Sequence, residues 1–329
     1  DKRPGEPGRA SLRLIDDGGT FLIAEEATLG VGATLVEASG VVRASDVSLV
    51  RLDLQRLAFG RNDLSGALSV REDGFYEIAL GGGVIDLQPM MDDVAASSGP
   101  ELPSFRLKGL IDRVWITDND AVHEVYIDGL YTGAIWESLA ISGQIDDETP
   151  MSVNIWRFSE SERRFEYNAA DVGDAIRLFG LFDHAEGGPL QVRARIDDAD
   201  PDHPATGAIR IEGFVLRQAP ILTRLLSIAS LEAIVNALTG DGLEFSGALM
   251  PFDKRGDIVT LTDARAFGPG LGITLGGEVD LGNNVLDLHG TFVPAYIVNS
   301  VLGEIPLIGD ILTGTEVGGG IFAFAFDVQ

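Results

Sequence analysis

The chain has 329 residues, with 51 acidic and 24 basic side chains and a formal net charge of −27. This charge excludes electrostatic binding of nucleic acid, whose affinity comes mainly from Lys and Arg that neutralise phosphates, and it disfavours docking flat on an anionic bilayer. Apolar residues make up 45% of the chain and Cys is absent, which indicates a folded protein without disulfides, thiolate catalysis or Cys-ligated zinc.

The chain opens with a polar segment rich in Pro and Gly. Residues 1–10 read DKRPGEPGRA and lack the apolar core of a signal peptide, so we expect a linker or an end segment there. We expect no membrane-spanning helix, because the uncharged stretch 288–303 is too short and contains Gly290 and Pro294.

Short runs with period-two alternation follow along most of the chain. Val50, Leu52 and Leu54 alternate with polar residues, and the pattern returns at 105–108, 192–196, 209–212 and 286–292. Turn clusters such as residues 16–19 and 281–284 connect such runs closely enough for hairpins. The sequence therefore predicts a mainly β, mostly antiparallel protein with roughly 18 to 20 strands, more than an open twisted sheet usually holds before it curls or splits. A sandwich, a barrel, a solenoid and a long rolled sheet all fit this number.

Two segments within this pattern are expected to be helical. The first covers 171–180, where Asp171 is suited to the N-cap, apolar residues follow at helical spacing and Gly180 is suited to the end. The second starts at Pro220 and runs towards Gly240. Its apolar face shifts near Ser230, so one kinked helix and two short helices both fit. A third, short helix is a candidate at 87–95.

No catalytic constellation emerges, and we expect neither an enzyme nor a cofactor. The four histidines are scattered, and the chain has no G-x-S-x-G elbow and no Walker loop. For a metal, the single arrangement with ligand spacing is Asp198, Asp200 and Asp202, whose alternate carboxylates suit calcium. The glycine and the closing Glu of an EF-hand are missing, however, and a solvated loop between strands is the alternative.

The C-terminal half has a more specific pattern. Residues 214–245 read FVLRQAPILTRLLSIASLEAIVNALTGDGLEF, and residues 290–314 read GTFVPAYIVNSVLGEIPLIGDILTG. These segments resemble the C-terminal region of the AsmA-like family of bacterial envelope proteins, in particular its long YhdP-type members. The resemblance covers about 163–329. Residues 11–162 have only short β runs with Gly and Asp turns in common with the family. The resemblance also implies attachment to the inner membrane, which we expect through an N-terminal segment that is absent from this chain.

The resemblance implies a long antiparallel sheet that is curled into a groove with an apolar inner face and stands in the periplasm. Such proteins resemble the bridge-like lipid-transfer proteins and are implicated in moving phospholipid between the inner and outer membranes. Expected partners are phospholipid acyl chains, the membranes at the ends of the full-length protein, and other envelope proteins. The expected divisions are 1–10, a β region at 11–162 that continues the groove, and the AsmA-like region at 163–329.

On this hypothesis, two sets of apolar residues have assigned roles. The expected groove lining follows one strand parity: Phe245, Leu249, Val279, Leu281, Leu286, Leu288 and Phe292. The expected gate, or contact with a membrane or partner, comprises Leu222, Leu225, Leu226, Leu231, Val235, Pro294, Tyr296, Ile305, Pro306 and Leu307. The alternative is that the first set fills an ordinary sandwich core and that the second packs as a lid or caps the sheet edge.

The energetics of a lipid conduit fit the lack of a polar site. Each acyl CH₂ removed from water contributes about 0.8 kcal/mol, on the order of 20 kcal/mol for a two-chain lipid, and leaving a bilayer costs nearly the same. Net transfer is then near neutral, and an apolar wall suffices. Two other functions remain open: a structural or interaction module of the envelope with a filled core, and a calcium- or carbohydrate-binding β protein.

Overall fold

The computed structural model describes residues 8–89, 102–133, 135–146, 148–180, 184–217, 223, 238–283, 285–294 and 324–328. This part of the chain is mainly β, with 19 strands. The chain divides into two compact units, 1–158 and 159–329, whereas the division expected at 162/163 rested on the family resemblance and stays a prediction. Among the described residues, no helix has both the length and the apolar character needed to span a membrane.

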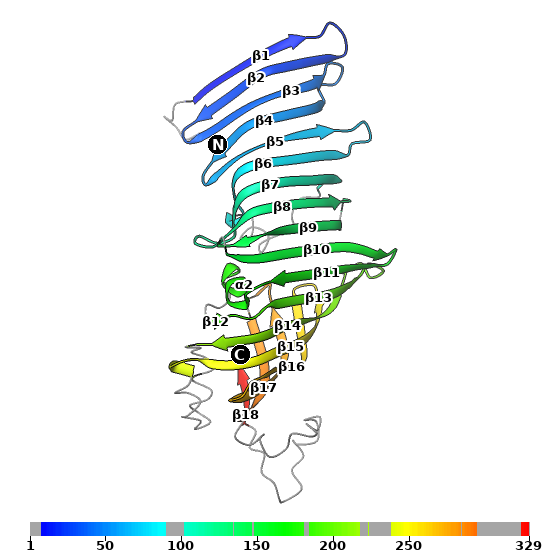
Figure 1. Ribbon diagram of the computed structural model, residues 1–329. Helices are drawn as coiled ribbons and strands as arrows, with labels where there is room; N and C mark the ends of the chain where they lie inside the picture. The colour runs from blue at the N-terminus through cyan, green and yellow to red at the C-terminus, as the bar shows by residue number, and fades with distance from the viewer. Residues whose placement is uncertain are drawn as a thin grey trace, which may run out of the picture. The chain divides into compact units, whose positions relative to one another are not determined.

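Unit 1 is an open sheet in which each strand pairs with the next one in the chain (Figure 1). Its strands are β1 (Gly8–Asp16), β2 (Phe21–Val31), β3 (Thr34–Arg43), β4 (Leu49–Phe59), β5 (Asn62–Val70), β6 (Tyr76–Asp86), β7 (Phe105–Trp115), β8 (Ala121–Tyr131), β9 (Trp136–Ile145) and β10 (Thr149–Ser159). Every pair is antiparallel except β6 and β7, so the expected antiparallel architecture is confirmed with one exception.

The parallel pair β6–β7 differs from the short hairpins that we expected throughout. Tyr76 lies opposite Phe105, and the two strands run in the same direction as far as Asp86 and Trp115. The chain between them covers 87–104, which exceeds the roughly one dozen residues that a parallel crossover needs. The candidate helix at 87–95 lies mostly outside the described residues.

The strands of unit 2 also form an open antiparallel arrangement, which curls from β14 towards β18 (Figure 1). Its strands are β11 (Glu162–Ala169), β12 (Ala185–Glu186), β13 (Leu190–Asp197), β14 (Ala205–Leu216), β15 (Leu243–Arg255), β16 (Ile258–Phe267), β17 (Leu271–Asp280), β18 (Val285–Pro294) and β19 (Phe324–Val328). The antiparallel order is β11-β13-β14-β15-β16-β17-β18-β19, with the two-residue β12 also paired to β14.

The helix predicted at 171–180 is confirmed as α2 (Val172–Leu178). The Asp171 carboxylate accepts hydrogen bonds from the backbone N–H groups of Gly173 and Asp174, at 2.7 and 3.1 Å, and so caps the helix. Gly180 follows with a φ of +66° and donates its N–H to the Arg177 carbonyl. At Gly173 an added Cβ would lie 2.0 Å from the Ala185 carbonyl oxygen, so a glycine is needed for α2 to approach β12 this closely.

The second predicted helix, at 220–240, lies almost wholly outside the described residues. The same is true of nine of the ten gate residues. Pro294 is the exception: its backbone ends β18 opposite Leu271.

Candidate functional site

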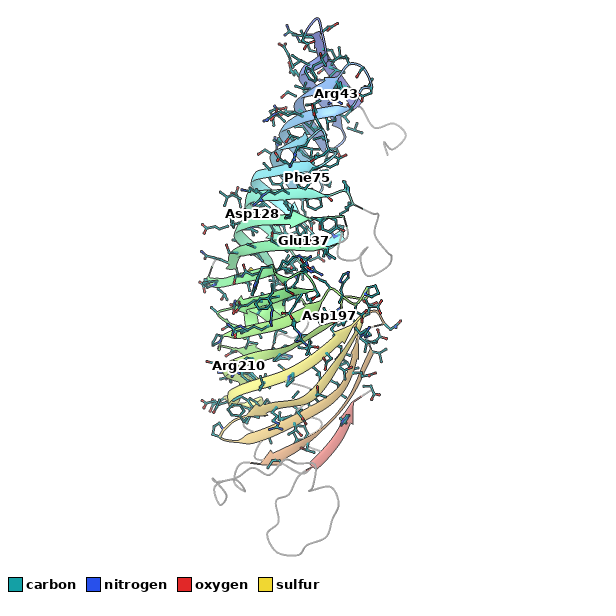
Figure 2. The ribbon with its side chains drawn as sticks, turned by 90° about the vertical axis from the view of Figure 1, so that its right-hand side faces the viewer. Arg43, Phe75, Asp128, Glu137, Asp197 and Arg210 are labelled. Atoms are coloured by element: carbon teal, nitrogen blue, oxygen red, sulfur yellow. The ribbon has the colours of Figure 1, made fainter. Side chains whose placement is uncertain are left out.

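The two faces of the sheet in unit 1 differ sharply in polarity. Strand pairing fixes which side chains share a face, because successive residues of a strand point to opposite sides. One face, called here the apolar face of unit 1, includes Val36, Leu52, Leu54, Leu64, Leu68, Ile78, Leu80, Leu107, Ile127, Ile141, Val153 and Ile155. The opposite face has charged pairs such as Arg51–Asp53 and Arg106–Asp128 (Figure 2 labels Asp128).

The strands of unit 2 repeat this division into an apolar and a polar face. Its apolar face includes Phe165, Tyr167, Val192, Ile196, Ile209, Met250, Phe252, Val259, Leu261, Ile273, Leu275, Val279, Leu286, Leu288 and Phe292. The opposite face includes Glu166, Arg193, Arg195, Arg210, Asp253, Arg265, Glu278 and Asp287, of which Arg210 is labelled in Figure 2. A mainly apolar surface therefore runs across the strands of unit 2, and strand pairing places two charged residues, Arg163 and Lys254, on the same face.

The apolar face of unit 2 is packed at one end of its strands and open at the other. At the packed end Phe245, Leu271 and Phe292 are at most 2% exposed, and the Phe245 ring stacks on Phe214 with centroids 5.0 Å apart. Towards the other end Leu288 is half-buried and Leu286 is 41% exposed. Half-exposed aliphatic side chains in a continuous row form a surface that can take an apolar ligand.

Five of the seven predicted lining residues lie on this face. Pairing places Val279 opposite Leu286, and Phe292 opposite Ile273 on the same face. Phe245 and Phe292 belong to the packed end, however, and so form core at that point instead of free wall.

The predictions for the other two lining residues were wrong. Leu249 lies on the polar face, opposite Arg210 and Arg265. Phe245 and Ala248 are both buried although they are three residues apart. The set of residues that faces inward therefore shifts by one position between them. Leu281 follows the end of β17 and is 53% exposed in the turn to β18.

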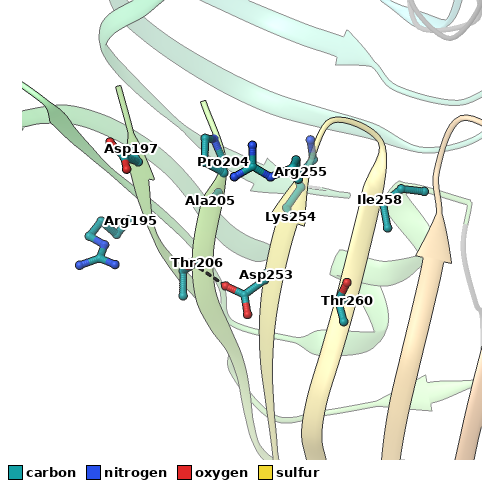
Figure 3. Close-up of a pocket in the computed structure, with 10 residues that line it drawn as sticks. All are labelled: Arg195, Asp197, Pro204, Ala205, Thr206, Asp253, Lys254, Arg255, Ile258 and Thr260. Atoms are coloured by element: carbon teal, nitrogen blue, oxygen red, sulfur yellow. Dashed lines mark hydrogen bonds between the residues drawn. The ribbon is translucent and has the colours of Figure 1, made fainter. Parts of the chain in front are cut away.

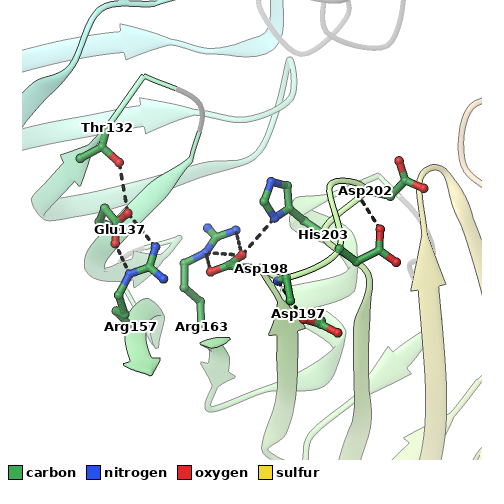
Figure 4. A network of polar contacts seen from close by, with 10 residues as sticks. Thr132, Glu137, Arg157, Arg163, Asp197, Asp198, Asp202 and His203 are labelled. Carbon is green, nitrogen blue, oxygen red and sulfur yellow. Dashed lines mark hydrogen bonds and ion pairs between the residues drawn. The ribbon is translucent and has the colours of Figure 1, made fainter. Parts of the chain in front are cut away.

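The acidic loop after β13 forms ion pairs instead of a cation site (Figure 4). Asp198, with 5% of its side chain exposed, accepts hydrogen bonds from Arg163 Nε and Nη2 at 2.9 to 3.0 Å and lies 3.0 Å from His203 Nδ1. Asp200 and Asp202 pair instead with Arg255, at 3.0 and 3.3 Å. The three carboxylates thus serve different partners, and within the described ranges no three His or acidic residues converge as metal ligands.

These ion pairs differ in how far they are exposed to solvent and therefore in how strongly each charge depends on its partner. The backbone N–H of Asp202, followed by the Arg255 guanidinium, lowers the pKa of Asp200 below its ordinary value on an exposed loop. Arg163 and Asp198 are nearly buried, so each charge depends on the other for compensation. In unit 1, Arg157 of β10 makes a comparable but more exposed pair with Glu137 of β9 (Figure 4).

A cleft of about 520 Å³ opens on unit 2 where the ends of β13, β14, β15 and β16 meet (Figure 3). Its charged groups already have partners: Thr206 Oγ1 donates to Asp253 at 2.6 Å, and Arg255 pairs with the acidic loop. The Thr206 hydroxyl on Asp253 is the hydroxyl–carboxylate pair of this wall, and the lining residues include no histidine to act with it. The cleft therefore offers a mixed polar surface and no recognisable catalytic arrangement.

The sequence reading missed two features of unit 2. The first is the buried ion pair between Arg163 and Asp198. Arg163 lies in an otherwise apolar set on β11, and this break in the alternation could have predicted a buried acidic partner. Tyr167, on the same strand, is 7% exposed, and its hydroxyl has no hydrogen-bond partner among the described residues. Burial raises the pKa of Tyr167 to about 12, so the phenol is neutral over the whole physiological range.

Comparison with known proteins gives no neighbour: no family model, no curated protein and no solved structure matches this chain.

Proposed function

We propose that this chain binds phospholipid without catalysing a reaction and forms part of a periplasmic conduit that moves lipid between bacterial inner and outer membranes. The observation that carries the proposal is the mainly apolar face of each unit, which is half-exposed along much of its length and backed by a charged face. The resemblance implies a place in the bacterial envelope. There the full-length protein would be attached to the inner membrane, and its partners would be the two membranes and other envelope proteins.

The physical argument rests on what an apolar face needs. Aliphatic side chains left in water forgo about 25 cal/mol per Å² of the stabilisation that burial supplies. A closed core recovers that free energy at the packed end of unit 2, around Phe245 and Phe292. Around Leu286 and Leu288 the described side chains leave part of it unrecovered, and acyl chains would supply the missing contacts.

A structural or interaction module of the envelope, without lipid, is the second candidate. The packed end of unit 2 favours it, because Phe214, Phe245 and Leu271 form an ordinary core there. Calcium or carbohydrate binding has no comparable support, since the acidic loop is engaged with Arg163 and Arg255.

The test is to incubate the purified, delipidated protein with vesicles of defined phospholipid. The measured quantities are the lipid bound per chain and the lipid that the protein then delivers to acceptor vesicles. Phospholipid binding with transfer supports the conduit. A folded chain that neither binds nor transfers lipid overturns it in favour of the structural module.

A further inference from the structure

Tyr167 is the one described tyrosine whose hydroxyl is buried without a hydrogen-bond partner. It lies on β11 opposite Val192, on the apolar face of unit 2, with Phe165 and Ala169 on the same side of its strand. Buried hydroxyl groups normally find a partner, because desolvation without one costs free energy. An orphan hydroxyl on a face built to hold a ligand indicates that the ligand supplies the acceptor.

The surroundings restrict what the acceptor is. The side chains beside Tyr167 are apolar, and the ring of Phe179, at the end of α2, meets the Tyr167 ring edge to face with centroids 6.2 Å apart. A phosphate placed here would lose its hydration without gaining a counter-charge, since Arg163, the charged residue on the same face of β11, is already paired with Asp198. A neutral oxygen is therefore the better partner for a neutral phenol.

We propose that the Tyr167 hydroxyl donates a hydrogen bond to an ester carbonyl of a diacyl glycerolipid held on the apolar face of unit 2. The ester group is where such a lipid changes from hydrocarbon to polar headgroup, so Tyr167 sets how deep the lipid lies. This inference rests on the proposed function and adds a substrate class to it: ester-linked lipids over ether-linked lipids of the same length.

Entry of the lipid requires a local adjustment. Tyr167 is 7% exposed, so a lipid must displace a neighbour to reach its hydroxyl, and the neighbour that it would displace is Phe179, which is 46% exposed and meets the Tyr167 ring edge to face. Displacing Phe179 replaces one aromatic contact by acyl contacts and gives the orphan hydroxyl its partner.

The experiment compares a diacyl phosphoglycerolipid with its dialkyl ether analogue, competing for the delipidated full chain and quantified by mass spectrometry of the extract. One hydrogen bond predicts that the wild type holds the ester lipid about five-fold more tightly, equivalent to roughly 1 kcal/mol. Tyr167→Phe should abolish that preference and leave ether-lipid binding unchanged. Tyr126→Phe is the matched control, because Tyr126 lies on the polar face of unit 1 and is 43% exposed.

A second measurement separates this role from a structural one. Because Tyr167→Phe removes an unpartnered buried hydroxyl, the lipid-free variant should melt at the same temperature as the wild type or higher. Equal binding of ester and ether lipids by the wild type, or a preference that survives Tyr167→Phe, overturns the inference but not lipid binding. If the wild type binds neither lipid, the proposed function fails and this inference falls with it.

Discussion

An aspartate placed on each face of unit 2 gives the sharpest test of which surface meets lipid. Leu288→Asp puts a carboxylate on the apolar face, at the open end of β18, whereas Leu249→Asp puts one on the polar face of β15. Leu288 is half-buried and Leu249 is 36% exposed, so neither change removes a packed core residue. The two variants have the same residue types and the same change in net charge.

The expected magnitudes differ because the neighbours differ. Burying a leucine side chain fully is worth about 1.5–3 kcal/mol, and a carboxylate facing an acyl chain must also lose hydration. For Leu288→Asp we therefore expect lipid binding to fall by at least about tenfold, at 1.4 kcal/mol per tenfold. Aspartate at 249 lies opposite Arg210 and Arg265, where a surface ion pair contributes about 0–1 kcal/mol, so binding should be unchanged.

Circular dichroism first establishes that both variants fold. The assay then measures, for each variant, the lipid bound per chain and the transfer of a labelled phospholipid from donor to acceptor vesicles. Loss in Leu288→Asp alone supports the assignment of faces. Equal transfer by both folded variants, or loss in Leu249→Asp alone, would refute the reasoning from strand register.

Three further outcomes follow from the described contacts. Arg163→Ala should lower the free energy of unfolding by about 3–5 kcal/mol, because it removes the guanidinium that accounts for most of the printed hydrogen bonds to the buried Asp198 carboxylate and leaves it to His203, and replacing both residues by apolar ones should recover much of the loss; urea denaturation measures both. Gly173→Ala should destabilise by about 1–3 kcal/mol or more, since its Cβ meets a backbone carbonyl, whereas Gly30→Ala, with open space around it, should cost less; thermal melting compares them. The lowered pKa of Asp200 means that its ion pair stabilises the fold above the ordinary Asp pKa and is lost as the pH falls through the folded value, so Asp200→Asn should flatten the acid limb of a stability-against-pH curve, and an unchanged curve would contradict this.

The alternation of apolar and polar residues was sufficient to predict the fold class and most of the apolar face. The pattern around 192–196, 209–212 and 286–292 depends on local chain geometry, and the structure confirms these segments as parts of β13, β14 and β18. The cap and end of α2 were predictable for the same reason, because Asp171 and Gly180 act on backbone groups within a few residues of themselves.

The failures come from changes of parity and from distant partners. Leu249 was assigned to the wrong face because the strand shifts its inward-facing set between Phe245 and Ala248. The same shift occurs on the neighbouring β14, where Ile211 and Phe214 are both buried around Gly213, which has a φ of +56°. No local periodicity encodes such a shift.

Long-range pairing is equally invisible in a periodicity analysis. Asp198 looked like a calcium ligand because its neighbours are acidic, but its partner Arg163 lies 35 residues earlier in the chain. The hydroxyl of Tyr167 is buried and has no hydrogen-bond partner among the described residues. Only the three-dimensional structure can show this, because it depends on every residue that surrounds the hydroxyl.

The central claim is that the apolar faces carry lipid, and the most direct measurement is mass spectrometry of the organic extract of the purified protein, checked by native mass spectrometry of the intact chain. The account predicts phospholipid in stoichiometric amounts, retained by the intact chain. A folded, lipid-free chain that stays empty after exposure to phospholipid vesicles would contradict it and would assign the apolar faces to packing alone.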